Sequence, residues 1–201
     1  MATINYSGLY PILHTPFDSN GEVDYDSFRR LVSHVDGAGI EGMAFPGFVS
    51  EWWRLTGDEI LKCGSCIERP FIGVVTPQAT VPPLRRAREL ERLGAGGLML
   101  LPRFLLASSP ANHLEALLSA TELPCIVQDS AGLTGGRLDA EALAELAGKY
   151  SNLAGIKVDQ VPTGRPSLHF VRRPGFGIFP TSPGTLAYSG STRKGAAPRR
   201  S

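Results

Sequence analysis

The stretch Leu153-Ala154-Gly155-Ile156-Lys157-Val158 is the last of six short apolar runs, and the regular spacing of these runs decides the fold. Most of the runs contain no polar residue, which is typical of strands that are buried on both faces of a parallel sheet. Successive runs begin 27 to 34 residues apart, which is the length of a strand followed by a helix. The six runs are Gly8–Leu13, Gly42–Phe45, Phe71–Val75, Leu98–Leu101, Cys125–Val127 and Leu153–Val158.

Amphipathic segments between several of these runs predict helices. Tyr25–Asp36 carries its apolar residues on one face and follows Asp24, a residue type that caps helix N-termini well. Leu84–Leu93 and Asp139–Ala147 show the same pattern. The sequence therefore predicts an α/β protein with a TIM (β/α)8-type barrel, incomplete at about six βα units. A doubly wound open sheet is the alternative.

Charge divides the chain into two regions that the formal net charge of +1 conceals. Up to residue 159 the chain has 13 Lys and Arg against 19 Asp and Glu, whereas residues 160–201 have 7 Lys and Arg and no acid. Six prolines in this second region prevent any long helix. We therefore expect residues 1–164 to form the partial barrel and residues 165–201 to form a basic, Pro/Gly/Arg-rich tail that is poorly ordered.

The tail has three possible interpretations. It resembles what GC-rich DNA encodes when it is read out of frame, and this is the interpretation we favour. Alternatively, Phe176–Phe179 is the remnant of an ordered seventh strand. Electrostatic binding of nucleic acid has less support, because the seven basic residues have no interleaved aromatic residues.

Composition excludes several classes of protein. No apolar run approaches the roughly 20 residues that a transmembrane helix requires, and no signal peptide is visible at the N-terminus. Three cysteines cannot form a fully paired disulfide framework, so we expect a cytoplasmic protein. The four histidines share no ligand spacing with carboxylates or cysteines, and no dinucleotide-binding fingerprint follows a strand. We therefore expect neither a metal nor a cofactor.

Lys157 is the most informative candidate for a catalytic residue. It stands at the end of the sixth apolar run, and the carboxyl ends of the strands face the active site in a barrel. Partial desolvation lowers the pKa of an amine, and a neutral amine can attack a ketone to form a Schiff base. The alternative is a lysine whose ammonium group extends from a strand end into solvent.

Several separate motifs resemble one family of enzymes. Thr15-Pro16-Phe17 follows the first run, Glu51-Trp52-Trp53-Arg54-Leu55-Thr56 the second and Pro102-Arg103-Phe104 the fourth, and Gly155-Ile156-Lys157 lies in the sixth. In this order they resemble the dihydrodipicolinate synthase/N-acetylneuraminate lyase family of class I aldolases, over about residues 8–164. The resemblance implies a TIM barrel, commonly a homotetramer, that binds pyruvate or another 2-oxo acid through Lys157.

The sequence departs from this family in two motifs. The segment that binds the carboxylate of the 2-oxo acid has lost two hydroxyl side chains and reads Gly47-Phe48-Val49-Ser50-Glu51. After the fifth run the proton-relaying tyrosine of the family is Gln128, and an arginine that recognises a second carboxylate is Leu133, beside Thr134. Authentic dihydrodipicolinate synthase activity is therefore not expected. Asp129 is the nearest group that could carry a proton, although an Asx turn would explain it equally well.

These observations predict a Schiff-base-forming lyase that acts on pyruvate or a keto-deoxy sugar acid. The alternative is a non-catalytic barrel fragment that only binds a ligand or partner. The candidate catalytic residues are Lys157, Asp129 and Gln128, and the candidate substrate-binding residues are Gly47, Phe48, Val49, Ser50 and Thr134.

Overall fold

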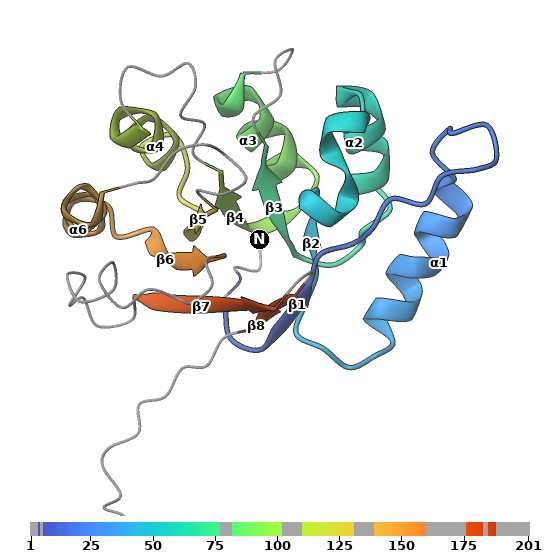
Figure 1. Ribbon diagram of the computed structural model, residues 1–201, viewed down its shortest axis with the longest axis horizontal. Helices are drawn as coiled ribbons and strands as arrows, with labels where there is room; N and C mark the ends of the chain where they lie inside the picture. Colours follow the sequence, from blue (N-terminus) through green and yellow to red (C-terminus); the bar gives the residue numbers. More distant parts are fainter. Residues whose placement is uncertain are drawn as a thin grey trace, which may run out of the picture.

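The computed structural model describes residues 4, 6–76, 82–101, 110–130, 139–159, 176–182 and 185–187. Within them, strands and helices alternate along the chain as far as β6 (Figure 1). The strands are β1 (Leu9–Pro11), β2 (Ala44–Phe45), β3 (Phe71–Val75), β4 (Ala95–Leu100), β5 (Cys125–Asp129), β6 (Leu153–Val158), β7 (Gly177–Ser182) and β8 (Thr185–Ala187). The α-helices are α1 (Tyr25–Asp36), α2 (Gly57–Gly64), α3 (Pro83–Arg92), α4 (Pro110–Leu118) and α6 (Ala140–Lys149); two short 3-10 helices, η1 (Phe48–Ser50) and η2 (Trp52–Arg54), follow β2.

The strands form one eight-stranded sheet in the order β1-β8-β7-β6-β5-β4-β3-β2. Neighbouring strands from β2 to β7 are parallel, whereas β8 is antiparallel to both β7 and β1. A parallel bridge between Ile12 and Ala44 joins the β1 side of the sheet to β2, which closes the ring. The predicted TIM-type fold is confirmed. The number of strand–helix units is incomplete, because the last two strands, β7 and β8, form a hairpin instead of alternating with helices.

The hairpin differs from what we expected of the tail. Most of residues 165–201 lie outside the described residues, but two segments of this region are strands, and β7 includes most of the possible remnant Phe176–Phe179. Gly177 pairs with Gly155 and Phe179 with Lys157 along β6. The edges of β6 and β1 would otherwise present unpaired backbone groups, and the hairpin satisfies both. In Figure 1 no described helix covers the outer side of β7 and β8.

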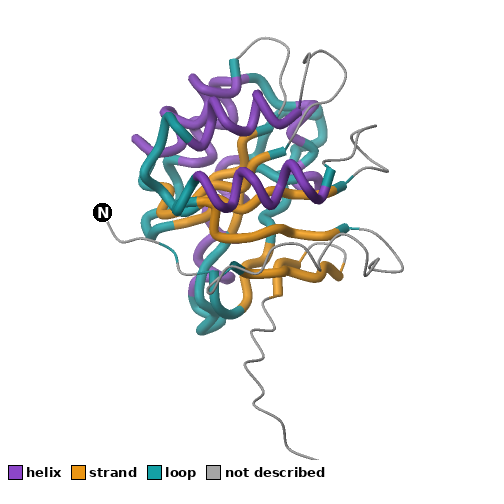
Figure 2. Tube along the Cα trace, turned by 90° about the vertical axis from the view of Figure 1, so that its left-hand side faces the viewer, coloured by secondary structure: helices purple, strands orange, loops and turns teal. Residues whose placement is uncertain are grey.

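Two separate apolar cores lie on the two faces of the sheet. Alternate residues of β3 to β5, such as Ile72, Met99 and Ile126, pack with one another inside the barrel. Their neighbours along the strands pack outward with helix residues such as Phe28 and Leu90. Figure 2 shows the helices (purple) stacked against the strands (orange) that they cover. Because side chains alternate between the faces, each strand position can be assigned to the interior or the exterior.

The N-terminal segment closes one end of the barrel. Tyr6 is buried, and its hydroxyl group donates to the carbonyl oxygens of Leu98 at 2.8 Å and Pro124 at 2.6 Å. The backbone N–H of Ile4 donates to the carbonyl of Gly96 at 2.9 Å. These contacts lie at Gly96 and Leu98 of β4 and at Pro124, just before β5. The segment therefore forms the floor of the barrel, away from the carboxyl ends of the strands.

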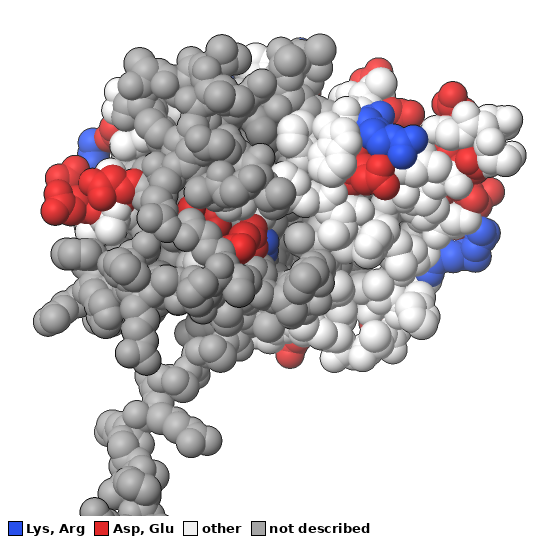
Figure 3. All heavy atoms as spheres, in the orientation of Figure 1, with Lys and Arg blue, Asp and Glu red and all other residues white. Residues whose placement is uncertain are grey.

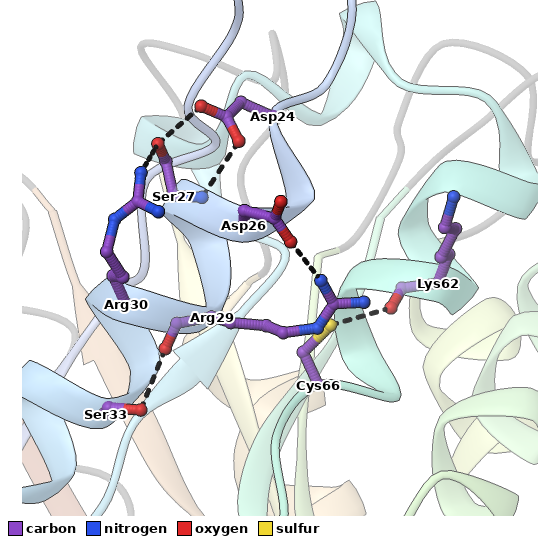
Figure 4. Close-up of polar contacts among 8 residues, drawn as sticks. All are labelled: Asp24, Asp26, Ser27, Arg29, Arg30, Ser33, Lys62 and Cys66. Atoms are coloured by element: carbon purple, nitrogen blue, oxygen red, sulfur yellow. Dashed lines mark hydrogen bonds and ion pairs between the residues drawn. The ribbon is translucent and has the colours of Figure 1, made fainter.

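Polar side chains fix the beginning of α1. Asp24 is the N-cap, as predicted, and its carboxylate accepts a hydrogen bond from the backbone N–H of Ser27 at 2.9 Å (Figure 4). One turn further, Asp26 and Arg29 form an exposed ion pair at 2.6 Å. The predicted helix boundaries are confirmed at both ends.

Helix α2 is short, with eight residues, and begins at a capping box. The hydroxyl of Thr56 accepts from the backbone N–H of Glu59 at 3.2 Å, while the carboxylate of Glu59 accepts from the backbone N–H of Thr56 at 2.7 Å. In the described part of the chain, no helix is both long and apolar enough to cross a bilayer.

Candidate active site

Lys157 lies on the inner face of β6, near the carboxyl end of the strand. Its register partner on β5 is Gln128, and its partner on β7 is Phe179. Gln128 occupies the same face as Ile126 of the inner core, because the two are separated by one residue. Lys157 and Gln128 are 4% and 2% exposed. Two polar side chains are thus enclosed at the level where the apolar barrel core ends.

Asp159 connects these two side chains. Its Oδ1 accepts a hydrogen bond from Nζ of Lys157 at 2.6 Å, and its Oδ2 accepts one from Nε2 of Gln128. The backbone N–H of Asp159 donates to the carbonyl oxygen of Asp129 at 3.0 Å, which extends the pairing of β5 and β6 by one residue. Asp159 was not among the predicted site residues, although a residue two positions after Lys157 shares its face on an extended strand.

The charge state of Lys157 reflects two opposing effects. Burial lowers the pKa of its ammonium group, because the charged form loses hydration. The carboxylate of Asp159 acts in the opposite direction through its charge and its hydrogen bond. Burial dominates, so the pKa of Lys157 lies below its ordinary value of 10.5.

The chain after β2 forms a tight polar loop on the opposite side of the ring from β6. The hydroxyl of Ser50 donates to the carbonyl of Leu13 at 2.5 Å and accepts from the backbone N–H of Gly47 at 2.9 Å. The hydroxyl of Thr15 donates to the carbonyl of Ser50 at 2.8 Å. Phe48 and Val49 pack against the inner core. Ser50 therefore organises the turn that carries Gly47, Phe48 and Val49 at the carboxyl end of β2.

The structure separates the remaining candidates. It brings Gln128 to Lys157, but Asp129 pairs in register with Val158, which belongs to the outer core. Strand alternation therefore places Asp129 on the face opposite that of Lys157. Thr134 lies outside the described residues. In the orientation of Figure 1, acidic side chains and a basic side chain are visible at the middle of the molecular surface (Figure 3).

The described histidine, cysteine and carboxylate side chains were the candidates for a metal or redox site. Among the residues whose positions the structure describes, no group of three or more His, Cys, Asp or Glu could hold a metal ion. Cys63, Cys66 and Cys125 are free thiols, and Cys66 donates to the carbonyl oxygen of Lys62 at 3.3 Å. Burial raises the pKa of Cys63 and of Cys125 to about 12, so these two thiols are poor nucleophiles.

Comparison with known proteins identifies relatives of the whole described barrel. Residues 5–163 match the Dihydrodipicolinate synthetase family. A 4-hydroxy-tetrahydrodipicolinate synthase from Stenotrophomonas maltophilia is 30% identical over 92% of this chain. The chain spans 66% of the length of that relative.

Solved structures share the fold. A prophage protein of the dihydrodipicolinic acid synthase family from E. coli K12, crystallised with pyruvate, matches 85% of this chain at a TM-score of 0.75 and 21% identity. A 2-keto 3-deoxygluconate aldolase from Picrophilus torridus matches 86% at a TM-score of 0.74 and 15% identity. This chain covers 62% and 67% of those two chains. The family match covers most of this chain, residues 5–163, and shows that the chain belongs to the dihydrodipicolinate synthetase family.

Proposed function

We propose that this chain is a lyase that forms a Schiff base between Lys157 and a 2-oxo acid. One observation carries the proposal: the buried amine of Lys157 lies on the inner face of β6 at its carboxyl end, where TIM-barrel enzymes bind their substrates. Its pKa is lowered by burial, which increases the fraction of neutral, nucleophilic amine. Relatives named as a synthase and as a lyase, together with a structural neighbour named as an aldolase, support the same reaction class.

The proposed substrate class is supported by related structures and by the sequence motifs near the amine. We propose pyruvate or a 2-keto-3-deoxy sugar acid, since one related structure was crystallised with pyruvate and another is a 2-keto 3-deoxygluconate aldolase. Gly47, Phe48, Val49, Ser50 and Thr134 are proposed to surround the carboxylate end of the substrate. Leu133, which stands where an arginine would recognise a second carboxylate, argues against a dicarboxylic product.

The proposed chemistry uses no group from outside the protein and its substrate. The ammonium group of Lys157 gives up one proton, and the freed amine forms a bond to C2 of the 2-oxo acid. That proton and one more from the nitrogen leave with the carbonyl oxygen as water. The resulting cationic imine withdraws electrons from the adjacent carbon. A proton or a carbon–carbon bond at that adjacent carbon can then be lost, and its electron pair moves toward the imine nitrogen to give an enamine. The enamine can in turn expel a hydroxyl group from the next carbon, which leaves with its own electron pair as water once it is protonated.

Borohydride trapping tests the proposal directly. Incubation with pyruvate and sodium borohydride should attach one reduced pyruvate per chain, at Lys157, as seen by intact mass and peptide mapping. Lys157→Ala should form no adduct. Lys149→Ala is the matched control, because Lys149 is exposed and pairs with Glu115 far from the barrel mouth, and this variant should react like the wild type.

Two outcomes of this experiment would contradict the proposal. An adduct that persists in Lys157→Ala would place the chemistry on another amine. Absence of any adduct with pyruvate and with 2-keto-3-deoxygluconate would favour the alternative, a barrel that only binds a ligand. We further propose a homo-oligomer, which light scattering of the purified chain would test.

A further inference from the structure

This chain lacks the tyrosine hydroxyl group that relays protons in the family it resembles. Asp159 is the described polar residue best placed to take over that role. Resemblance to the family assigns proton relay to a tyrosine, and Gln128 at that position cannot exchange protons near neutral pH. The carboxylate that contacts the reacting nitrogen is instead that of Asp159, at 2.6 Å from Nζ of Lys157. We propose that Asp159 is the catalytic acid and base that carries protons during imine formation at Lys157, and that Gln128 positions it. The inference rests on the proposed function.

The geometry holds the carboxylate in one orientation. One oxygen accepts from Lys157 and the other from Gln128, while the backbone of Asp159 is tied to the carbonyl of Asp129. The side chain of Asp159 is only 14% exposed and that of Lys157 5%. A carboxylate fixed on two sides cannot rotate away from the amine, so the distance over which a proton moves is maintained.

Asp129 is less well placed for this role. It is buried beside Gln128, but its register partner is Val158 of the outer core, so strand alternation directs it away from the face that carries Lys157. Asp159, two residues beyond Lys157, shares the inner face. The structure therefore favours Asp159 over Asp129 as the proton carrier, although both carboxylates are adjacent in the sheet.

The proton transfers balance with Asp159 as a shuttle. Its carboxylate first takes a proton from the ammonium group of Lys157, and the freed amine attacks C2 of the 2-oxo acid. Asp159 returns that proton to the resulting oxyanion, takes a second proton from the nitrogen, and gives it to the hydroxyl group, which leaves as water. The product is the protonated imine, and Asp159 is again a carboxylate.

Two roles for Asp159 predict opposite effects of Asp159→Asn. The charge of Asp159 raises the pKa of Lys157, so a purely electrostatic role predicts more neutral amine and faster imine formation in the variant. A proton carrier predicts slower imine formation, by about 100-fold or more. The sign of the change therefore separates the two roles.

The experiment is rapid-quench borohydride trapping of the purified full-length chain with pyruvate, with the rate of adduct formation as readout. Asp159→Asn should react at least about 100-fold more slowly, while reaching the same adduct at Lys157 at long times. Gln128→Met, which removes the amide that holds Oδ2, should also slow the reaction. Asp26→Asn, an exposed carboxylate of α1, is the control and should match the wild type.

Chemical rescue excludes a merely structural effect. Sodium formate should accelerate adduct formation by Asp159→Ala, whereas sodium chloride at the same ionic strength should not. Three results would overturn the assignment while leaving the proposed function intact. Asp159→Asn could form the adduct as fast as the wild type, or faster than the wild type, or only Asp129→Asn could slow its formation. A wild-type chain that forms no adduct would overturn both.

Discussion

Removal of the Tyr6 hydroxyl should destabilise the barrel by about 1 kcal/mol. This one group donates to two carbonyl oxygens, of Leu98 at 2.8 Å and Pro124 at 2.6 Å, from a position that is 2% exposed. A typical buried hydrogen bond contributes about 1 kcal/mol net. The single proton of this hydroxyl is shared between the two carbonyls, and that of Pro124 also accepts from the backbone N–H of Leu98 at 2.9 Å. Tyr6→Phe keeps the ring and removes only these bonds.

Urea unfolding followed by tryptophan fluorescence measures this change, since Trp52 and Trp53 lie in the same barrel. The midpoint should fall while the slope of the transition stays constant. Tyr150→Phe is the matched control: its hydroxyl donates to Glu115 at 3.1 Å in a half-buried position, so its loss should cost less than about 0.5 kcal/mol. If Tyr6→Phe lowered the free energy of unfolding as little as the control does, the reasoning that these two hydrogen bonds stabilise the floor of the barrel would be refuted.

Alkaline pH provides a second readout on the same residue. Burial raises the pKa of Tyr6 well above its ordinary value of 10.0. The unfolded chain releases this proton near pH 10 whereas the folded chain retains it, so folding stability falls as pH rises above 10. The slope is about 1.4 kcal/mol per pH unit for one proton. Tyr6→Phe should lack this component, so the stability difference between the two proteins should shrink above pH 10.

Three other perturbations have distinct expected outcomes. Gly97→Ala should lower the free energy of unfolding by about 1 to 3 kcal/mol in urea titrations, because a Cβ there would meet Oη of Tyr6 at 2.6 Å and a backbone carbonyl at 3.2 Å; unchanged stability would contradict the close packing. Thr56→Ala removes the capping box of α2 and should cost about 1 kcal/mol in the same assay, whereas Thr56→Ser should cost little. In the native protein a thiol reagent should label Cys66 fastest, with Cys63 and Cys125 reacting only after denaturation; rapid labelling of all three would show that the outer core opens readily.

The sequence predicted the parts of the fold that depend on local pattern. The boundaries of β3, β6 and α1 match the predicted ones, because unbroken apolar runs and a capping aspartate mark them locally. Strand β4 begins at Ala95, whereas the predicted run began at Leu98. The start was missed because the first residues of the strand include two glycines, which are typical of the end of a helix. Strand β8 was not predicted, since a three-residue strand acquires its identity only from its two neighbours.

The candidate site was partly predictable, because some of its residues are also marked by local sequence patterns. Lys157 and Gln128 could be identified from the ends of apolar runs and from the resemblance. Asp159 was missed because it lies one residue beyond β6, where no apolar pattern remains. The bond of Ser50 to Leu13 joins segments far apart in the chain, and such a contact follows from tertiary packing rather than from sequence spacing.

The hairpin that completes the sheet also limits where loop variation could change what the proposed site binds. Enzymes with this architecture diversify by altering the loops after their strands, while the scaffold stays constant. Here β7 and β8 are joined by two residues only, so one sector of the mouth offers almost no sequence to vary. Laboratory evolution of substrate range would therefore need to concentrate its diversity in the connections that follow β1 to β6, with the hairpin kept fixed.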